Sequence, residues 1–131
     1  MTDIIKVINS KDGVIHGKET NENEIKQAEL ELGLRFADDY RNYIKQFGCM
    51  VIGSREITGI SSQENYNVVS ITKAQRNYNK NLPENSYVIE QLNIDGIIIW
   101  QSSNGEVFQT SPNTAPMKIA DSLVEYIQSL Y

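Results

Sequence analysis

The first half of the chain carries hydrophobic residues at helical spacing. Between Asn21 and Gly33, apolar residues recur at intervals of three and four positions. These residues are Ile25, Ala28 and Leu32. Asn21 is a typical N-cap residue with Glu24 three positions later, and Gly33 is a typical helix stop. The pattern predicts a helix between Asn21 and Gly33 with one buried face.

A second helix is predicted over residues 38–47, with Asp38 or Asp39 as its cap and Gly48 as its end. Its apolar face consists of Tyr40, Tyr43, Ile44 and Phe47. A short helix is predicted over residues 3–8. Residues 67–77 fit either a strand or a helix, and the helical spacing of their apolar residues favours a helix.

In the second half of the chain, the spacing of hydrophobic residues changes to that of strands. Short strands are predicted over residues 49–52 and 55–60, followed by three longer strands and a closing helix. The longer strands are Tyr87–Leu92, Ile97–Gln101 and Glu106–Thr110, and the helix is Ile119–Leu130. Turns at residues 93–96 and 103–105 join the three strands, and the second contains Asn-Gly. Because residues 97–101 are almost wholly apolar, we expect a central strand covered on both faces.

The order of these elements predicts an α+β protein, with a mostly antiparallel mixed sheet and helices packed on one of its faces. A chain of 131 residues fits one domain, so residues 1–131 are predicted to form a single one.

Negative charge is concentrated in one part of the chain. The net charge is −5, from 12 basic and 17 acidic residues. Residues 81–117 contain four carboxylates and no Lys or Arg. The four are Glu84, Glu90, Asp95 and Glu106. A negative surface repels nucleic acid and attracts a basic partner, although four carboxylates over this length are also what ordinary solubilising surface groups look like.

Motifs for catalysis or cofactor binding are missing from the sequence. Cys49 is the single cysteine and His16 the single histidine, which rules out the usual zinc spacings. The sequence has no Gly-Lys-Ser/Thr phosphate loop and no Gly-x-Ser-x-Gly elbow. We therefore expect no catalytic residue, no metal and no cofactor, and interpret the chain as a binding protein.

The first residues lack the basic and apolar regions of an export signal, and the longest apolar run is Ile97–Trp100, far too short to span a bilayer. A cytoplasmic protein with no membrane partner is expected.

One stretch of the sequence resembles the N-terminal signature of the SUKH superfamily, which includes yeast cell-wall synthesis regulators and many bacterial immunity proteins. The residues that carry the likeness are Glu24, Ile25, Ala28, Glu29, Leu32, Gly33, Leu34, Phe36, Asp39, Tyr40, Tyr43, Ile44, Phe47 and Gly48. Ala37 departs from the pattern, since that position is commonly Pro. Later segments around Trp100, at 105–108 and at 119–127, match in order, so the likeness covers roughly residues 20–130.

The resemblance implies a mixed sheet wrapped by helices and no enzymatic activity. It also implies an immunity protein that binds and neutralises a cognate toxin domain, such as a basic nuclease of a polymorphic or contact-dependent system. With the charge distribution, it predicts six partner-binding residues. They are Glu84, Tyr87, Glu90, Asp95, Trp100 and Glu106.

Three alternatives remain open from the sequence. Toxin binding could instead use the Asp38–Asp39 helix or the Ser61–Asn67 loop. The chain could be a regulatory or scaffold module that binds a host protein. It could also be a hydrolase that uses carboxylates such as Glu90 and Glu106.

Overall fold

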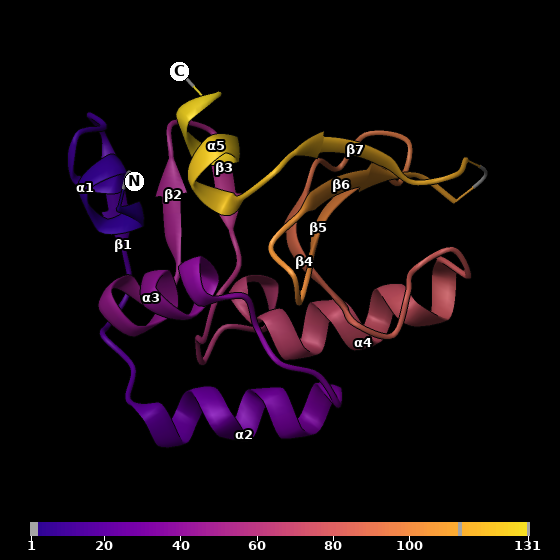
Figure 1. The fold of residues 1–131 in the computed structure, drawn as a ribbon, viewed down its shortest axis with the longest axis horizontal. Coiled ribbons are helices and arrows are strands. Elements are labelled where there is room, and N and C mark those ends of the chain that lie inside the picture. Colours follow the sequence, from indigo (N-terminus) through magenta and orange to yellow (C-terminus); the bar gives the residue numbers. More distant parts are fainter. Residues whose placement is uncertain (1–2, 113, 131) are drawn as a thin grey trace.

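The computed structural model describes residues 3–112 and 114–130. Figure 1 shows how the helices surround the strands. In chain order the elements are α1 (Ile4–Asn9), β1 (Val14–His16), α2 (Glu22–Leu32), α3 (Asp38–Phe47), β2 (Met50–Ile52), β3 (Arg55–Ile57), the 3-10 turn η1 (Glu64–Tyr66), α4 (Val68–Tyr78), β4 (Ser86–Gln91), β5 (Ile98–Ser102), β6 (Val107–Thr110), β7 (Met117–Ala120) and α5 (Leu123–Gln128). The four helices predicted before residue 80 are confirmed, including the ambiguous segment at 67–77.

The strands form two antiparallel sheets, with the orders β1-β2-β3 and β4-β5-β6-β7. Thr58, directly after β3, joins the two sheets. Its backbone N–H donates to the carbonyl of Ile89 at 2.9 Å, and its hydroxyl donates to the carbonyl of Val88 at 2.8 Å. The α+β class is therefore confirmed, although the strands divide between two sheets where the sequence predicted one.

The larger sheet is covered on both faces. On one face, Val88, Ile98 and Trp100 pack with Ile71 of α4, and Figure 1 shows α4 running along this sheet. On the other face, Tyr87 and other residues join the main core with α3 and α5. All residues of β5 are buried, which confirms the central strand but places helices on both faces of the sheet and not on one.

The ends of α2 follow the sequence pattern, whereas the start of α3 does not. The side-chain oxygen of Asn21 accepts a hydrogen bond from the N–H of Glu24 at 2.9 Å, and Gly33 ends α2 in the left-handed conformation with φ 69°. The N-cap of α3 is Ala37, which has no side-chain cap, so the prediction that Asp38 or Asp39 caps this helix is wrong. Tertiary contacts occupy Asp39 instead.

The C-terminal segment is not one helix. The prediction of a helix over Ile119–Leu130 is wrong for its first turn, because residues 117–120 form β7 and only Leu123–Gln128 is helical. Ala120 pairs with Val107 of β6, and the hydroxyl of Ser122 then accepts the N–H of Glu125 at 3.1 Å. A side-chain cap at Ser122 thus starts the helix after the strand has ended.

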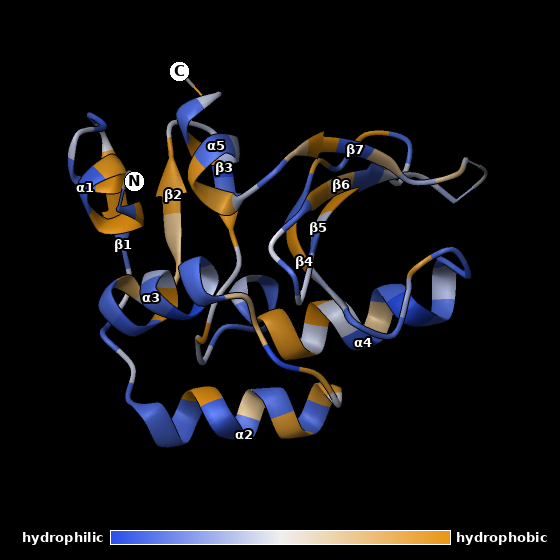
Figure 2. Cartoon of the chain, in the orientation of Figure 1, coloured by the Kyte–Doolittle hydropathy of each residue, from blue (hydrophilic) through white to orange (hydrophobic). Residues whose placement is uncertain are grey.

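Figure 2 shows the amphipathic character of the outermost helix, α2, which is mostly hydrophilic, in contrast to the hydrophobic strand β2. The buried stripe of α2 consists of Ile25, Ala28 and Leu32, as predicted. The other residues of α2 are exposed, except Glu22 and Glu29, which are half-buried.

Candidate partner-binding surface

The structure divides the six residues predicted for partner binding by exposure. Glu84 and Asp95 are exposed and Glu106 is half-buried, while Tyr87, Glu90 and Trp100 are at most 2% exposed. A partner meets side chains that reach the surface. The prediction is therefore corrected for the three buried residues, each of which makes contacts inside the molecule.

Glu90 belongs to a buried charge network between the sheets and α5. It lies at a register shift in β4, and its carboxylate accepts a hydrogen bond from Nε of Arg55 at 2.5 Å. The hydroxyl of Tyr126 donates to the same carboxylate and accepts from Nη2 of Arg55 at 3.2 Å. Burial, together with the Glu90 carboxylate, raises the pKa of Tyr126, which therefore remains protonated as a donor. Glu90 holds β3, β4 and α5 together and does not face a partner.

Tyr87 and Trp100 also use their polar atoms internally. The Tyr87 hydroxyl donates to Oε1 of Gln101 at 2.7 Å and accepts the N–H of Ala37 at 3.0 Å. Trp100 stacks on Phe108 with ring centroids 4.4 Å apart, and its indole N–H donates to Thr110 at 2.9 Å. Satisfied polar atoms in well-packed surroundings indicate core residues.

The two exposed residues of the predicted surface lie at opposite ends of one strand. Glu84 precedes β4, and Asp95 follows it in the turn to β5, where its φ of 53° is left-handed. Six residues of extended strand separate the two ends by roughly 20 Å. The acidic residues of 81–117 therefore do not converge on one surface.

Glu106, like Glu90, is paired with a cation from another strand. Lys118 of β7 lies 2.7 Å from the Glu106 carboxylate and 2.5 Å from that of Asp121. Hydrogen bonding to Lys118 and, less, to Asn104 lowers the pKa of Glu106 from its ordinary value of 4.5.

This pair gives a titration test. We expect NMR to report a pKa for Glu106 below 4.5 in the native chain, and a rise in that pKa in Lys118→Met. Because the folded pKa is depressed, the stabilising contribution is present above the ordinary pKa and is lost as pH falls through the folded value. An unshifted Glu106 in the native chain would contradict the ion pair.

A larger acidic surface, which we call the acidic groove, lies where the N-terminal ends of α1, α3 and α5 meet. It consists of two adjoining hollows of about 610 and 440 Å³, which share Asp38, Asp39 and Ser122. Its carboxylates are Asp3, Asp38, Asp39, Asp121 and Glu125, and the one cation among its lining residues is Arg35. The lining therefore holds five carboxylates against one guanidinium, and Lys118, which lies outside the lining, pairs with Asp121, so this described surface keeps a net negative charge.

Four of the five carboxylates of the acidic groove stand at the start of a helix, and Asp121 lies between β7 and α5. Asp3 caps α1 by accepting the N–H of Ile5 at 2.8 Å, and Glu125 stands in the first turn of α5. Asp38 begins α3 with its side chain 89% exposed, 3.6 Å from Arg35. Carboxylates at helix N-termini are favourable because they complement the helix dipole. Tertiary packing of three such helix ends then places the negative charges side by side.

Asp39 positions the helices that form the acidic groove. One carboxylate oxygen accepts the N–H of Leu123 at 2.7 Å, and the other accepts Nε2 of Gln101 at 3.1 Å. Gln101 in turn accepts the hydroxyl of Tyr87. One chain of hydrogen bonds thus fixes α3 to β4, β5 and the start of α5, so the acidic groove has a rigid base.

Sequence reasoning included only part of the acidic groove. The Asp38–Asp39 helix was one of the alternative surfaces, and Glu106 borders the groove through Lys118 and Asp121. Asp3, Asp121 and Glu125 were missed. Their sequence signal is weak, because an acidic residue at a helix start is explained by that helix alone.

The sequence of the chain identifies its protein family. The chain matches the SUKH_5 family, described as SMI1-KNR4 cell-wall, over residues 1–131. The chain belongs to this family. The predicted resemblance to the SUKH superfamily is thereby confirmed.

The fold has a solved relative. A crystal structure of a protein from Pseudomonas syringae pv. tomato matches with a TM-score of 0.77 and 13% sequence identity, covering 98% of this chain and 95% of that chain. At this identity the likeness shows the fold alone. A comparison with curated protein sequences gives no match.

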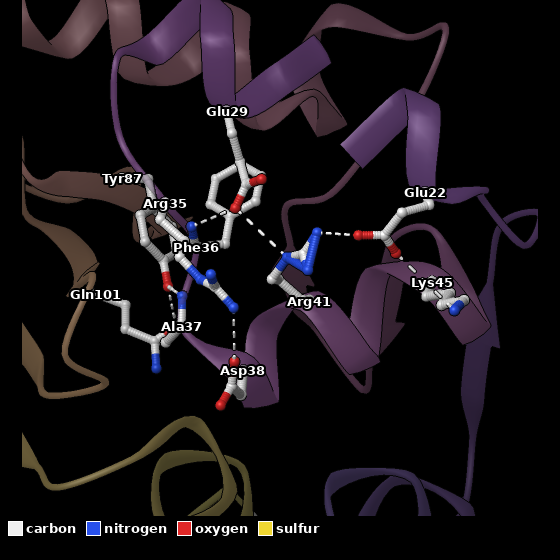
Figure 3. Close-up of polar contacts among 10 residues, drawn as sticks. All are labelled: Glu22, Glu29, Arg35, Phe36, Ala37, Asp38, Arg41, Lys45, Tyr87 and Gln101. Atoms are coloured by element: carbon white, nitrogen blue, oxygen red, sulfur yellow. Dashed lines mark hydrogen bonds and ion pairs between the residues drawn. The ribbon is translucent and has the colours of Figure 1, made fainter. Parts of the chain in front are cut away.

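In this SUKH_5 member, Arg41 and the signature residue Glu29 help to hold α2 against α3, as Figure 3 shows. Arg41 lies between two carboxylates of α2, paired with Glu22 and with its Nε 3.4 Å from Glu29. Glu29 also accepts the N–H of Phe36 at 2.8 Å, which fixes the connector between the helices. Arg41 therefore directs its charge toward Glu22 and Glu29 of α2, and it is not among the residues that line the acidic groove.

Residues considered for catalysis in the SUKH_5 chain make structural contacts. Burial raises the pKa of the Cys49 thiol, the opposite of the shift that a nucleophilic thiol needs. Glu90 pairs with Arg55, and Glu106 pairs with Lys118. One strand, β5, lies between these carboxylates, and they are also about 10 Å apart along the strand direction. The structure therefore does not bring them together for acid–base chemistry. In residues 3–112 and 114–130, no three His, Cys, Asp or Glu side chains are placed to hold a metal ion.

Over the same residues, each helix is too short or too polar to cross a bilayer.

Proposed function

We propose that this SUKH_5 protein is a non-catalytic immunity protein that binds and neutralises a cognate toxin domain in the cytoplasm through its acidic groove. The single observation that carries the proposal is the concentration of five carboxylates in two adjoining hollows with one cation. Family membership supports it, because the SUKH superfamily includes immunity proteins.

The charge of the acidic groove fits a basic protein and not a nucleic acid. Nucleases that bind polyanions expose Lys and Arg in their clefts, whereas phosphates are repelled by carboxylates. A negative groove accelerates the encounter with a basic cleft and selects against acidic partners. A toxin of the nuclease class is the partner with the complementary charge.

The acidic groove also provides contacts for affinity. Val124 lies half-buried among its carboxylates, and Asn42 and Gln128 are exposed hydrogen-bonding groups beside it. Apolar contact surrounded by polar and charged groups is the usual composition of a specific interface. The rigid base that Asp39 provides reduces the entropy lost on binding.

A two-step experiment tests this function. The tagged chain is isolated from its native cells, its stoichiometric partner is identified by mass spectrometry, and that partner is expressed with and without the chain. The expected partner is a protein domain that stops growth when expressed alone and is harmless when co-expressed.

A partner that does not impair growth would overturn the immunity function and favour a regulatory or scaffold module. A toxic partner whose effect persists during co-expression would also overturn it. Asp39→Asn is unsuitable as a control, because Asp39 positions the fold. Lys80→Ala is used as the matched reference instead, because it is an exposed change outside the acidic groove.

A further inference from the structure

A second groove runs between α2 and α4, away from the acidic groove. It has a volume of about 530 Å³ and an apolar floor of Ala28, Ile60 and Val69. Its remaining lining residues are Asn21, Asn23, Glu24, Gln27, Glu31, Asn67 and Ser70. The two grooves share no lining residue, so occupancy of one leaves the other accessible.

The rim of the α2–α4 groove is negative at two points. Glu24 and Glu31 are exposed, and the described lining contains no Lys or Arg. The two carboxylates are seven residues apart on one helix face, which corresponds to about 10 Å along the axis. An occupant with positive charges at the same separation would complement both.

The walls of the α2–α4 groove are preorganised, and part of its polar edge has free hydrogen-bonding capacity. Asn67 caps α4 by accepting the N–H of Val69 at 2.9 Å and donates to the carbonyl of Ser61 at 2.8 Å. Asn21 caps α2 in the same manner. By contrast, the amides of Asn23 and Gln27 are exposed and make no side-chain hydrogen bond with the described residues. Rigid walls with free amides favour recognition of a peptide.

We propose that the α2–α4 groove is a second docking site, which binds an amphipathic helical segment of a protein partner. The segment places aliphatic side chains on Ala28, Ile60 and Val69, and Lys or Arg residues seven positions apart opposite Glu24 and Glu31. This is the helix-in-groove mode, in which the apolar face provides affinity and the flanking charges set the register. The proposal goes beyond the acidic groove because its location and its helical ligand are different.

The test uses a defined probe. A synthetic 15-residue helical peptide carries Leu at one face and two Lys residues seven positions apart, and a second peptide replaces both Lys with Glu. Each is titrated into the isotope-labelled full chain, and backbone and side-chain amide shifts are followed by NMR. We expect saturable shifts centred on Asn23, Gln27 and Ser70 with the Lys peptide, and binding at least about tenfold weaker with the Glu peptide.

Two variants of equal net charge identify the site. Glu24→Lys with Glu31→Lys should weaken binding of the Lys peptide at least about tenfold, while Asp38→Lys with Glu125→Lys should change it less than about twofold. Ser70→Trp fills the groove without a change in charge and should abolish binding. Retained dispersion of the amide spectrum shows that each variant is folded.

Shifts centred on the acidic groove, equal weakening by both double variants, or no saturable binding of the Lys peptide would each overturn the proposal. Those outcomes leave the immunity function untouched, because growth rescue is measured in a separate experiment with the partner isolated from cells.

Discussion

Replacing Glu90 with alanine is expected to lower the free energy of unfolding by about 3 kcal/mol, the lower end of the range for breaking a buried ion pair. Glu90 is 2% exposed and binds both Arg55 and Tyr126. Its removal leaves the guanidinium of Arg55 without its carboxylate. The side chain of Arg55 is 31% exposed and keeps part of its hydration, so the loss stays at the low end. Urea unfolding followed by circular dichroism measures the change.

Two further variants separate this explanation from a general effect of losing a carboxylate. Glu84→Ala removes an exposed acid from the same segment and should change stability by no more than about 0.5 kcal/mol. Arg55→Met combined with Glu90→Met should be less destabilised than Glu90→Ala, because no buried charge remains unpaired. A Glu90→Ala protein as stable as Glu84→Ala would show that Glu90 is not a structural residue.

Glu90 also shows why the site was only partly predictable. A count of charges along residues 81–117 finds four carboxylates and no cation. Folding brings Arg55 to Glu90 and Lys118 to Glu106 from outside that segment. The charge count of the segment is therefore correct. The charge of the folded surface also depends on ion-pair partners from other segments, and a count within one segment does not include them.

The fold was easier to predict from the sequence than the site, because its main signals are local. The period of Tyr40, Tyr43, Ile44 and Phe47 predicted the buried face of α3, and all four are buried. Near the C-terminus, the helical spacing of Leu123 and Ile127 was extended too far back, into β7. The pairing of Ala120 with Val107 is a long-range contact that outweighs local helical preference there.

The acidic groove depends both on local sequence signals and on tertiary contacts. Asp3, Asp38 and Glu125 each stand at a helix start, which local physics explains. Their convergence depends on α1, α3 and α5 packing with neighbouring N-terminal ends, and the hydrogen bonds of Asp39 to Leu123 and Gln101 fix that arrangement. Individual carboxylates were therefore visible in the sequence, whereas the binding surface that they form was not.

Reversing two charges of the acidic groove, with Asp38→Lys and Glu125→Lys, is expected to weaken binding of the cognate toxin by about 100-fold or more at low salt, which corresponds to about 2.7 kcal/mol. Both side chains are exposed, and neither makes the tertiary hydrogen bonds that Asp39 makes, so the fold should persist. Each reversal replaces an attraction to a basic cleft with a repulsion, and much of the loss should appear in the association rate. Stopped-flow or surface plasmon resonance measurements at two salt concentrations give that rate, and its salt dependence should become weaker or change sign.

Glu84→Lys with Asp95→Lys changes the net charge equally but alters only the exposed residues of the surface predicted from sequence. That control should bind the toxin within about threefold of the native chain, because exposed charges far from the interface act only through a screened field. Loss of binding in the control and not in the groove variant would move the interface to the ends of β4 and refute the acidic groove as the binding surface.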